Sequence, residues 1–367
     1  MVINMRPSQY YIYSTSMAAW EAMRQAIIEA RHSIYWEVYI FIDDEIGSKF
    51  FDLLAAKAKA GIEVRLIIDA WGSFAISRGR VQALRQVGVD VQLFQERKHR
   101  YRGLWKKIIT RTHRKILVVD EAIGFIGGVN IDKTMAEWKD FHLRIDGSAV
   151  HSLLRAFAKS YLISGGQKSV VVHLLKYRSR LETDIKDIEF IFDEGNPTRA
   201  QTKQKYIEAL LKARERVILF SPYYFPDRSF LRALWQARRR GVRVDLLIPF
   251  RTDVRLATYA AYSWFSLMQR YGVHVHLLRG MMHGKGVVKD SDWAMIGSSN
   301  LEYNSFGRNY EANVKIYDKQ VVRRIKQTVL AWLHGSTTLD NLFWEKRNWW
   351  QRTKEWVARR LYLLWHK

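Results

Sequence analysis

Residues 113–130 read HRKILVVDEAIGFIGGVN, and residues 283–300 read HGKGVVKDSDWAMIGSSN. Both stretches contain a His, a Lys two residues later, an Asp five residues after the Lys and an Asn ten residues after the Asp. A single match of this kind could arise by chance in a chain rich in Lys, but two matches with the same downstream Asn could not. The second copy therefore indicates an internal duplication.

The sequence on either side of these stretches is also repeated. Residues 31–43 (RHSIYWEVYIFID) and 215–227 (ERVILFSPYYFPD) are short apolar runs, typical of buried strands. A helical pattern follows each run, stops at Gly61 or Gly241, and is followed by a second strand pattern. Strands that alternate with helices predict an α/β architecture. We therefore expect two similar α/β domains and a tail, over 1–170, 171–340 and 341–367.

The first two motif residues indicate phosphoryl chemistry. Positions i and i+2 of a strand face the same side, so His113 lies beside Lys115 and His283 beside Lys285. An ammonium neutralises phosphoryl oxygens while an imidazole attacks phosphorus or delivers a proton. Two such half-sites facing each other form a phosphoryl-transfer site that needs no metal. We assign His113 as the nucleophile and His283 as the acid, although the symmetry of the sequence does not distinguish them.

Other polar residues near the motifs have expected roles. The side-chain amides of Asn130 and Asn300 follow small residues and could donate hydrogen bonds to the same phosphoryl oxygens. Asp140 and Glu311 come after the motifs, and each could orient the imidazole of its own half through the other ring nitrogen. The alternative for both carboxylates is an ordinary place on the surface.

The composition restricts the class of protein. Among 367 residues, 60 Lys plus Arg against 36 Asp plus Glu give a net charge of +24, which favours a polyanionic partner. The chain has no Cys, which excludes disulfides, Cys-ligated zinc and thiol catalysis. His274 and His276 have the spacing of metal ligands, but no acidic cluster adjoins them, so we read them as half-exposed strand residues. We expect no metal and no cofactor.

Two basic segments contain aromatic residues. The segment 95–112 (QERKHRYRGLWKKIITRT) adjoins the first motif, and we expect it to contact anionic lipid through four residues, Tyr101, Trp105, Ile108 and Ile109. The alternative is a loop that is solvated or contacts nucleic acid. The tail, as an amphipathic helix, would place Trp349, Trp350 and Trp356 on one broad face for membrane contact. The alternative is a terminal helix packed on the core.

The doubled H-x-K-x4-D pattern, followed by G-G-x-N or G-S-x-N, resembles the phospholipase D superfamily. The resemblance covers residues 10 to 335. It implies two α/β domains with the active site at their interface and a covalent phosphohistidine. It also implies catalytic roles for the motif residues, with the aspartates serving mainly to hold the motif together: His113, Lys115, Asp120, His283, Lys285 and Asp290.

Within that superfamily, residues 34–73 and FIGGVNI (125–131) resemble the bacterial cardiolipin synthases, which join two phosphatidylglycerols and release glycerol. Longer members begin with transmembrane helices, and this chain is similar to the shorter members. The resemblance implies a phosphatidyltransferase at the cytoplasmic side of the cell membrane, peripheral and monomeric, whose partners are phosphatidylglycerol and cardiolipin. The alternatives are a phospholipid hydrolase and a phosphodiesterase nuclease, and nucleic acid is the less favoured partner.

Overall fold

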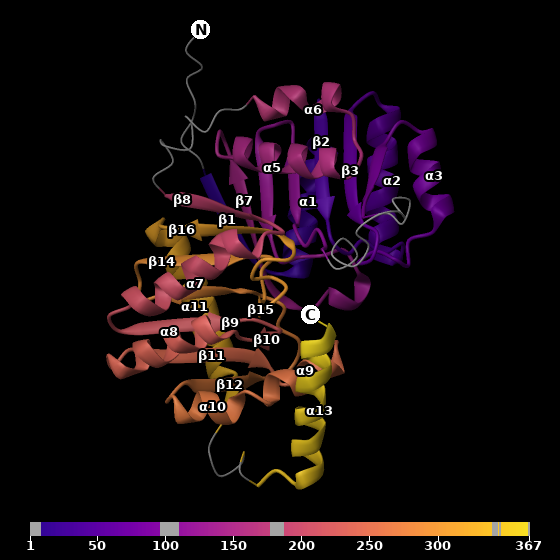
Figure 1. Cartoon of the computed structure of the whole chain (residues 1–367). Coiled ribbons are helices and arrows are strands. Elements are labelled where there is room, and N and C mark those ends of the chain that lie inside the picture. Colours follow the sequence, from indigo (N-terminus) through magenta and orange to yellow (C-terminus); the bar gives the residue numbers. More distant parts are fainter. Residues whose placement is uncertain (1–8, 96–109, 177–186, 340–343, 345, 366–367) are drawn as a thin grey trace.

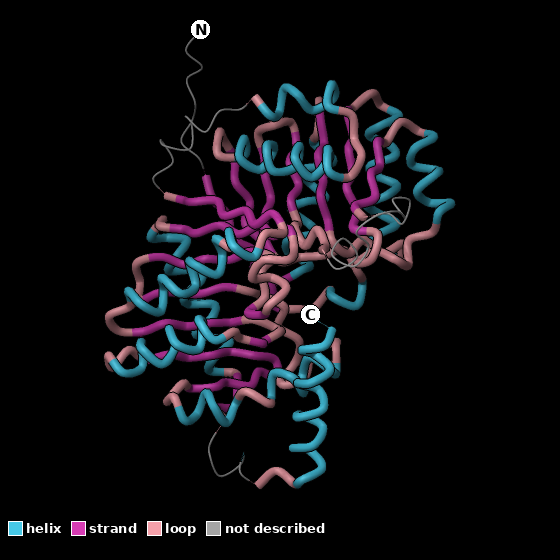
Figure 2. The backbone as a smooth tube through the Cα atoms, viewed as in Figure 1, coloured by secondary structure: helices cyan, strands magenta, loops and turns pink. Residues whose placement is uncertain are grey.

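The computed structural model describes residues 9–95, 110–176, 187–339, 344 and 346–365. Two α/β halves lie side by side, each built on one mixed β-sheet with helices on both faces (Figure 1). Figure 2 shows that loops from both halves gather where the two sheets approach each other. This arrangement confirms the expected pair of similar α/β domains.

The first sheet has seven strands in the order β1-β7-β6-β5-β2-β3-β4. Its strands are β1 (Gln9–Thr15), β2 (Ser33–Val38), β3 (Glu63–Asp69), β4 (Asp90–Phe94), β5 (Ile116–Val119), β6 (Ile123–Gly127) and β7 (Lys139–Asp146). The helices are α1 (Ser16–Glu29), α2 (Glu45–Lys59), α3 (Arg78–Gln86), α5 (Val150–Ile163) and α6 (Lys168–Leu175), with the short 3-10 helix η1 (Lys133–Met135).

The second sheet repeats this order as β8-β16-β14-β13-β9-β11-β12, and β17 adds one strand beside β12. Its strands are β8 (Ile188–Glu194), β9 (Arg216–Phe220), β11 (Arg243–Pro249), β12 (His274–Leu278), β13 (Gly286–Lys289), β14 (Trp293–Gly297), β16 (Tyr310–Ile316) and β17 (Ser336–Thr338). A separate parallel pair joins β10 (Tyr224–Phe225) to β15 (Leu301–Glu302). The helices are α7 (Gln201–Lys212), α8 (Arg228–Arg239), α9 (Arg255–Tyr262), α10 (Phe265–Arg270), α11 (Lys319–His334) and α13 (Trp349–Trp365), with η3 (Pro197–Arg199).

The two predicted helix ends have the expected backbone. Gly61 has φ +85° and Gly241 has φ +84°, in the left-handed region that favours glycine. Near the expected division at residue 170, α6 buries Val171 and Leu174 in the same core as α5, and β8 forms the far edge of the second sheet. The division of the chain at 170 and 340 stays a prediction.

Three hydrophobic cores hold the layers together. One lies between the first sheet and α1, α2 and α3, and another between the second sheet and α7 to α10. The third runs through both halves and contains side chains of α5, α6 and α11. In it, the ring of Phe141 lies 5.6 Å from that of Phe220 and 4.8 Å from that of Trp332, measured between centroids. Because this interface is a continuous apolar core, the two halves are held in one relative position.

Helix α13 packs on α9 and combines two surfaces. Glu355, Ala358 and Tyr362 are buried against the second half. Five large apolar side chains are exposed on the same helix: Trp349, Trp350, Trp356, Val357 and Leu361. The helix thus packs on the core through a narrow face and also presents an aromatic face. Among the described helices, none is both long enough and apolar enough to cross a membrane.

Candidate active site

The two motifs meet because each pairs with a strand of the opposite half. The backbone N–H of His113 donates to the carbonyl of Tyr310 at 2.8 Å, at the start of β16. The backbone N–H of His283 donates to the carbonyl of Lys139 at 2.7 Å, at the start of β7. These equivalent crossings bring both histidines and both lysines to the interface, where all four are buried.

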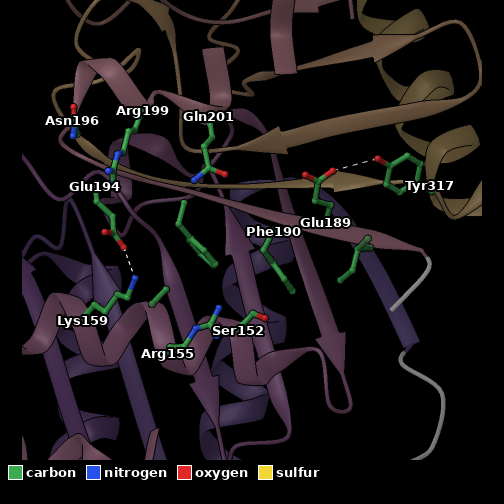
Figure 3. A pocket seen from close by; sticks show the side chains of 13 residues that line it. Ser152, Arg155, Lys159, Glu189, Phe190, Glu194, Asn196, Arg199, Gln201 and Tyr317 are labelled. Atoms are coloured by element: carbon green, nitrogen blue, oxygen red, sulfur yellow. Dashed lines mark hydrogen bonds and ion pairs between the residues drawn. The ribbon is translucent and has the colours of Figure 1, made fainter. Parts of the chain in front are cut away.

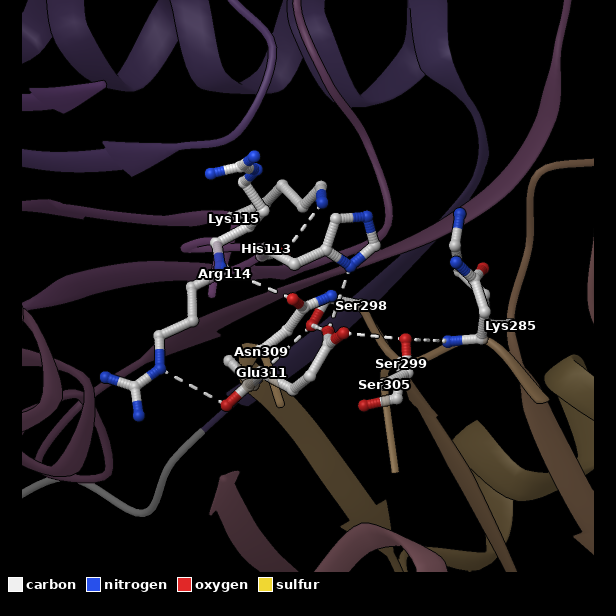
Figure 4. Close-up of polar contacts among 12 residues, drawn as sticks. His113, Arg114, Lys115, Lys285, Ser298, Ser299, Ser305, Asn309 and Glu311 are labelled. Carbon is white, nitrogen blue, oxygen red and sulfur yellow. Dashed lines mark hydrogen bonds and ion pairs between the residues drawn. The ribbon is translucent and has the colours of Figure 1, made fainter. Parts of the chain in front are cut away.

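The orienting carboxylates also cross between the halves. Nδ1 of His113 lies 3.0 Å from Oε2 of Glu311, and Nδ1 of His283 lies 2.7 Å from Oδ2 of Asp140 (the first contact is drawn in Figure 4). The expectation that each carboxylate serves its own half is therefore wrong. The alternative of an ordinary surface position is excluded for both, since Glu311 is 0% and Asp140 1% exposed.

The carboxylates determine which ring nitrogen carries the proton. An ionised carboxylate only accepts hydrogen bonds, so each Nδ1 is the protonated nitrogen of its neutral ring. Burial would raise the pKa of Glu311, but the adjacent charges of His113 and Lys115 outweigh it and lower the pKa to about 2. Burial likewise opposes ionisation of Asp140, whose pKa is held below its usual value by Lys285 and His283.

Both histidines are neutral near pH 7. Burial lowers the pKa of His113 to about 4, and Glu311 only partly offsets this effect. Burial, with the charge of Lys285, also lowers the pKa of His283. Neither Nε2 makes a hydrogen bond within the described part of the chain. A neutral imidazole with Nδ1 protonated and Nε2 uncommitted is the form that attacks an electrophile.

The lysines form a buried pair of like charges. Burial and the charge of Lys285 lower the pKa of Lys115 well below its usual value. Burial lowers the pKa of Lys285 to about 8. Each Nζ donates to the backbone carbonyl of the histidine two residues earlier, and that of Lys115 lies 4.8 Å from the ring centroid of Tyr39. An anionic phosphodiester placed between the two ammonium groups would relieve their repulsion.

The two motif asparagines differ in orientation. Oδ1 of Asn130 accepts from the backbone N–H of Ile40 at 3.2 Å, and its Nδ2 is buried without a partner. Nδ2 of Asn300 donates to Oε1 of Glu302 at 3.2 Å, and its Oδ1 is buried without a partner. Asn130 therefore has both N–H groups of its amide uncommitted, whereas Asn300 has one N–H bound to Glu302 and an unpartnered Oδ1.

The difference between Gly128 and Ser298 follows from the carboxylate that each motif faces. The hydroxyl of Ser298 donates to Oε2 of Glu311, and that of Ser305 donates to Oε1 at 2.7 Å. A Cβ on Gly128 would lie 2.2 Å from Oδ1 of Asp140. The longer Glu311 is therefore held by two serine hydroxyls, while Asp140 requires glycine beside it.

The motif aspartates lie outside this cluster and make equivalent contacts. Asp120 accepts from the backbone N–H groups of residues 31, 32 and 33, at 2.7 to 3.2 Å. Asp290 accepts from those of residues 214, 215 and 216, at 2.8 to 3.1 Å. Each carboxylate ties the end of a motif strand to the start of β2 or β9. These contacts support the structural role that the resemblance implies.

The sequence analysis did not identify Arg114, between His113 and Lys115. Its guanidinium is fully buried and donates to the carbonyls of Glu311 at 3.2 Å and Asp193 at 3.0 Å, thereby joining the halves beneath the site (Figure 4). Because successive side chains of a strand point to opposite sides, the sequence indicates only that the side chain of Arg114 points away from those of His113 and Lys115. Glu302 was also missed, because an acidic residue two positions after an Asn gives no sign of the contact between them.

Three further predictions concern other regions. Tyr101, Trp105, Ile108 and Ile109 lie outside the described residues. His276 is buried, with its Nε2 2.9 Å from Oδ1 of Asp245, so it differs from the half-exposed residue expected. The tail residues Trp349, Trp350 and Trp356 are each about 60% exposed on α13.

The described part of the chain also contains a cavity that lies apart from this site. A cavity of about 660 Å³ lies between α5 and β8, and none of the motif residues lines it (Figure 3). One of its lining cations, Lys159, is already paired with Glu194 at 2.8 Å. The cavity is therefore not part of the candidate site.

Comparisons with known proteins identify relatives of this chain. A family model described as "Cardiolipin synthase, PLD-like domain" matches residues 23–160 and 206–332. The cardiolipin synthase of Halalkalibacterium halodurans is 33% identical over 353 residues, which cover 92% of this chain and 69% of that protein. Cardiolipin synthase 2 of Bacillus anthracis is 32% identical over 315 residues, covering 84% and 61%. The chain thus spans between 61% and 69% of the length of these two relatives.

A solved structure supports the fold. The crystal structure of phosphatidylserine synthase from Haemophilus influenzae superposes with a TM-score of 0.73, covering 97% of this chain and 92% of that one. The sequence identity is 14%, so the similarity shows a shared fold.

Proposed function

Because the chain belongs to the cardiolipin synthase family with phospholipase D-like domains, we propose that it transfers a phosphatidyl group from one phosphatidylglycerol to a second, releasing glycerol. The observation that carries this proposal is the pair of buried histidines, each held at Nδ1 by a carboxylate of the other half. Two buried imidazoles at the interface between the halves support a two-step displacement at phosphorus, in which one acts as nucleophile and the other as acid.

In the first step, Nε2 of His113 attacks phosphorus, and the bond between phosphorus and the glycerol oxygen breaks. His283, in its protonated form, delivers a proton to the departing alkoxide. Burial disfavours that protonated form, but an anionic phosphodiester beside the ring stabilises it, as does Asp140. A positioned acid of this kind contributes roughly 10² to 10⁴-fold in rate.

In the second step, His283 removes the proton from a hydroxyl of the second phosphatidylglycerol. The resulting oxygen attacks phosphorus, and the bond between phosphorus and Nε2 of His113 breaks, which restores the neutral imidazole. Lys115 and Lys285 neutralise the phosphoryl oxygens in both steps, together with the uncommitted amide N–H of Asn130. The products are cardiolipin and glycerol.

The proposed enzyme acts at a membrane surface. The net charge of +24 and the exposed aromatic face of α13 support attachment to an anionic membrane, with phosphatidylglycerol and cardiolipin as the lipid partners. We propose a peripheral, monomeric enzyme at the cytoplasmic side of the cell membrane.

Purified protein incubated with phosphatidylglycerol vesicles tests this proposal. We expect cardiolipin and free glycerol in equal amounts, measured by lipid chromatography and a glycerol assay. His113→Ala and His283→Ala should each abolish both products. Phosphatidic acid without cardiolipin would instead identify a hydrolase, and cleavage of DNA without lipid turnover would identify a nuclease.

A further inference from the structure

The two motif asparagines occupy equivalent positions in the sequence but leave opposite ends of their amides without a partner. In Asn130 a backbone N–H binds Oδ1, which leaves the amide nitrogen without a partner. In Asn300 the carboxylate of Glu302 binds the amide nitrogen, which leaves Oδ1 without a partner. Both side chains are almost fully buried, at 1% and 3% exposed. The group left wholly without a partner is therefore a donor in Asn130 and an acceptor in Asn300, whose amide nitrogen still has one N–H free of Glu302.

Glu302 fixes Asn300 because Glu302 is itself held on both oxygens. Its Oε1 accepts from Asn300, and its Oε2 accepts from the hydroxyl of Tyr362 on α13. Burial raises the pKa of Glu302, while the hydrogen bonds from Tyr362 and Asn300 and the charge of Lys285 lower it. The tail helix thus reaches the polar cluster of the site through one side chain.

The first half has no such arrangement. The residue equivalent to Glu302 is Asp132, two positions after Asn130. Oδ1 of Asp132 accepts from the backbone N–H of Thr134 at 2.8 Å and from its hydroxyl at 2.7 Å, and it caps η1. Asp132 therefore acts within its own turn, and the acceptor end of Asn300 is a property of the second half.

The chemistry of the two ends differs. Phosphoryl oxygens accept hydrogen bonds, so they suit the amide nitrogen of Asn130 and are repelled by Oδ1 of Asn300 beside a carboxylate. A buried acceptor requires a donor, which a hydroxyl supplies. An ammonium headgroup is also a donor, but Lys285, whose pKa is influenced by Glu302, would repel it.

We propose that Oδ1 of Asn300, positioned by Glu302 and Tyr362, accepts a hydrogen bond from a hydroxyl of the glycerol headgroup, while Asn130 binds the phosphate. The inference rests on the proposed function and extends it to the choice of headgroup. Asn300 contacts the substrate, and Glu302 and Tyr362 are positioning residues. The second half is then the alcohol side of the site.

Glu302→Gln and Tyr362→Phe test this inference, with Asp132→Asn as the matched control in the first half. A Gln side chain at position 302 can place its amide nitrogen where Oε1 of Glu302 accepts from Nδ2 of Asn300, which favours an Asn300 amide turned over so that Oδ1 accepts from the new Gln side chain instead of from the substrate. We expect Glu302→Gln to lower the ratio of cardiolipin to phosphatidic acid about tenfold, the order of one hydrogen bond. Tyr362→Phe should lower it by a smaller factor, and Asp132→Asn should leave it unchanged.

The amount of covalent phosphatidyl-enzyme separates this effect from a loss of folding or of chemistry. We expect similar trapped enzyme in the wild type and in Tyr362→Phe, whose substitution keeps the ring. An unchanged product ratio in Glu302→Gln would overturn the inference, as would an equal change in Asp132→Asn. A second measurement compares the rates at which each enzyme uses phosphatidylglycerol and phosphatidylethanolamine. If the preference for phosphatidylglycerol does not fall in Glu302→Gln, the inference is also overturned.

The same variants distinguish failure of this inference from failure of the proposed function. If the wild type releases only phosphatidic acid, transfer to a second lipid is refuted. The headgroup preference still tests Asn300, because the leaving alcohol carries the same hydroxyls. A fall in that preference in Glu302→Gln would support the hydroxyl contact in a hydrolase, and no fall would refute it.

Discussion

At the scale of single residues, the imidazole of each motif contacts a carboxylate from the opposite half. Glu311 contacts His113, and Asp140 contacts His283. The acidic residue that follows each motif indicates the carboxylates, but it cannot indicate the crossing, because both halves have one. The crossing arises from backbone pairing of His113 with Tyr310 and of His283 with Lys139, residues far apart in the sequence, which no local pattern records.

A double-mutant cycle on the free energy of unfolding checks this pairing. We predict a coupling of about 0.5–3 kcal/mol between His113→Ala and Glu311→Gln, because the residues are in contact. The coupling between His113→Ala and Asp140→Asn should be smaller, since Asp140 contacts the other histidine. A larger coupling for the second pair would contradict the crossed arrangement.

Gly128→Ala should inactivate the enzyme without changing a catalytic group. The added Cβ would lie 2.2 Å from Oδ1 of Asp140 and displace the carboxylate that holds His283. A displacement of about 1 Å can cost about 10²-fold in rate, so we predict a fall in kcat of that order. Gly79→Ala, whose Cβ would lie 3.8 Å from its nearest neighbour, serves as the control. Full activity in Gly128→Ala would refute the steric argument.

At the scale of elements, α13 has a buried face and an exposed aromatic face, which a sequence pattern cannot separate. The amphipathic spacing identifies the aromatic face, but burial of Ala358 and Tyr362 depends on where the helix docks. The sequence pattern is compatible with both membrane contact and packing on the core. The structure places packing on one narrow face and leaves the tryptophans exposed on the other.

Replacing Trp349, Trp350 and Trp356 by Ser should weaken membrane binding and leave stability unchanged. These rings are about 60% exposed, so folding gains little from their burial. We predict reduced co-sedimentation with phosphatidylglycerol vesicles and an unaltered Tm. Trp235→Ser, at an exposed tryptophan of α8, is the control. Vesicle binding equal to that of the wild type would count against the aromatic face.

At the scale of the whole molecule, the duplication in the sequence predicts two halves, and the sheets repeat one strand order. The motif spacing also identifies the side chains that meet at the interface. The opposite orientations of Asn130 and Asn300 were not predictable, because they depend on Ile40 and Glu302, which occupy different surroundings in the two halves. The duplication in the sequence therefore predicts the architecture, whereas the asymmetry of the site can be found only in the three-dimensional structure.

The buried histidines should make stability sensitive to acid. The pKa of His113 is about 4 against an ordinary 6.5, so between these values the unfolded chain binds more protons. This contribution therefore lowers stability as the pH falls through that range. Between pH 7 and pH 5 the wild type should lose about 2 kcal/mol more than His113→Asn, measured by denaturant unfolding. Equal losses would show that His113 is not held neutral by burial.

The most direct test of the account is to trap and map the covalent intermediate. Phosphatidylglycerol labelled with ³²P at its phosphate, mixed with enzyme and quenched rapidly, should leave one label on the protein. The account predicts that the label is stable to base, labile to acid and located on His113, and that His113→Ala abolishes it. Label on His283 would reverse the two roles. Steady product formation without any labelled histidine would contradict transfer through a phosphohistidine.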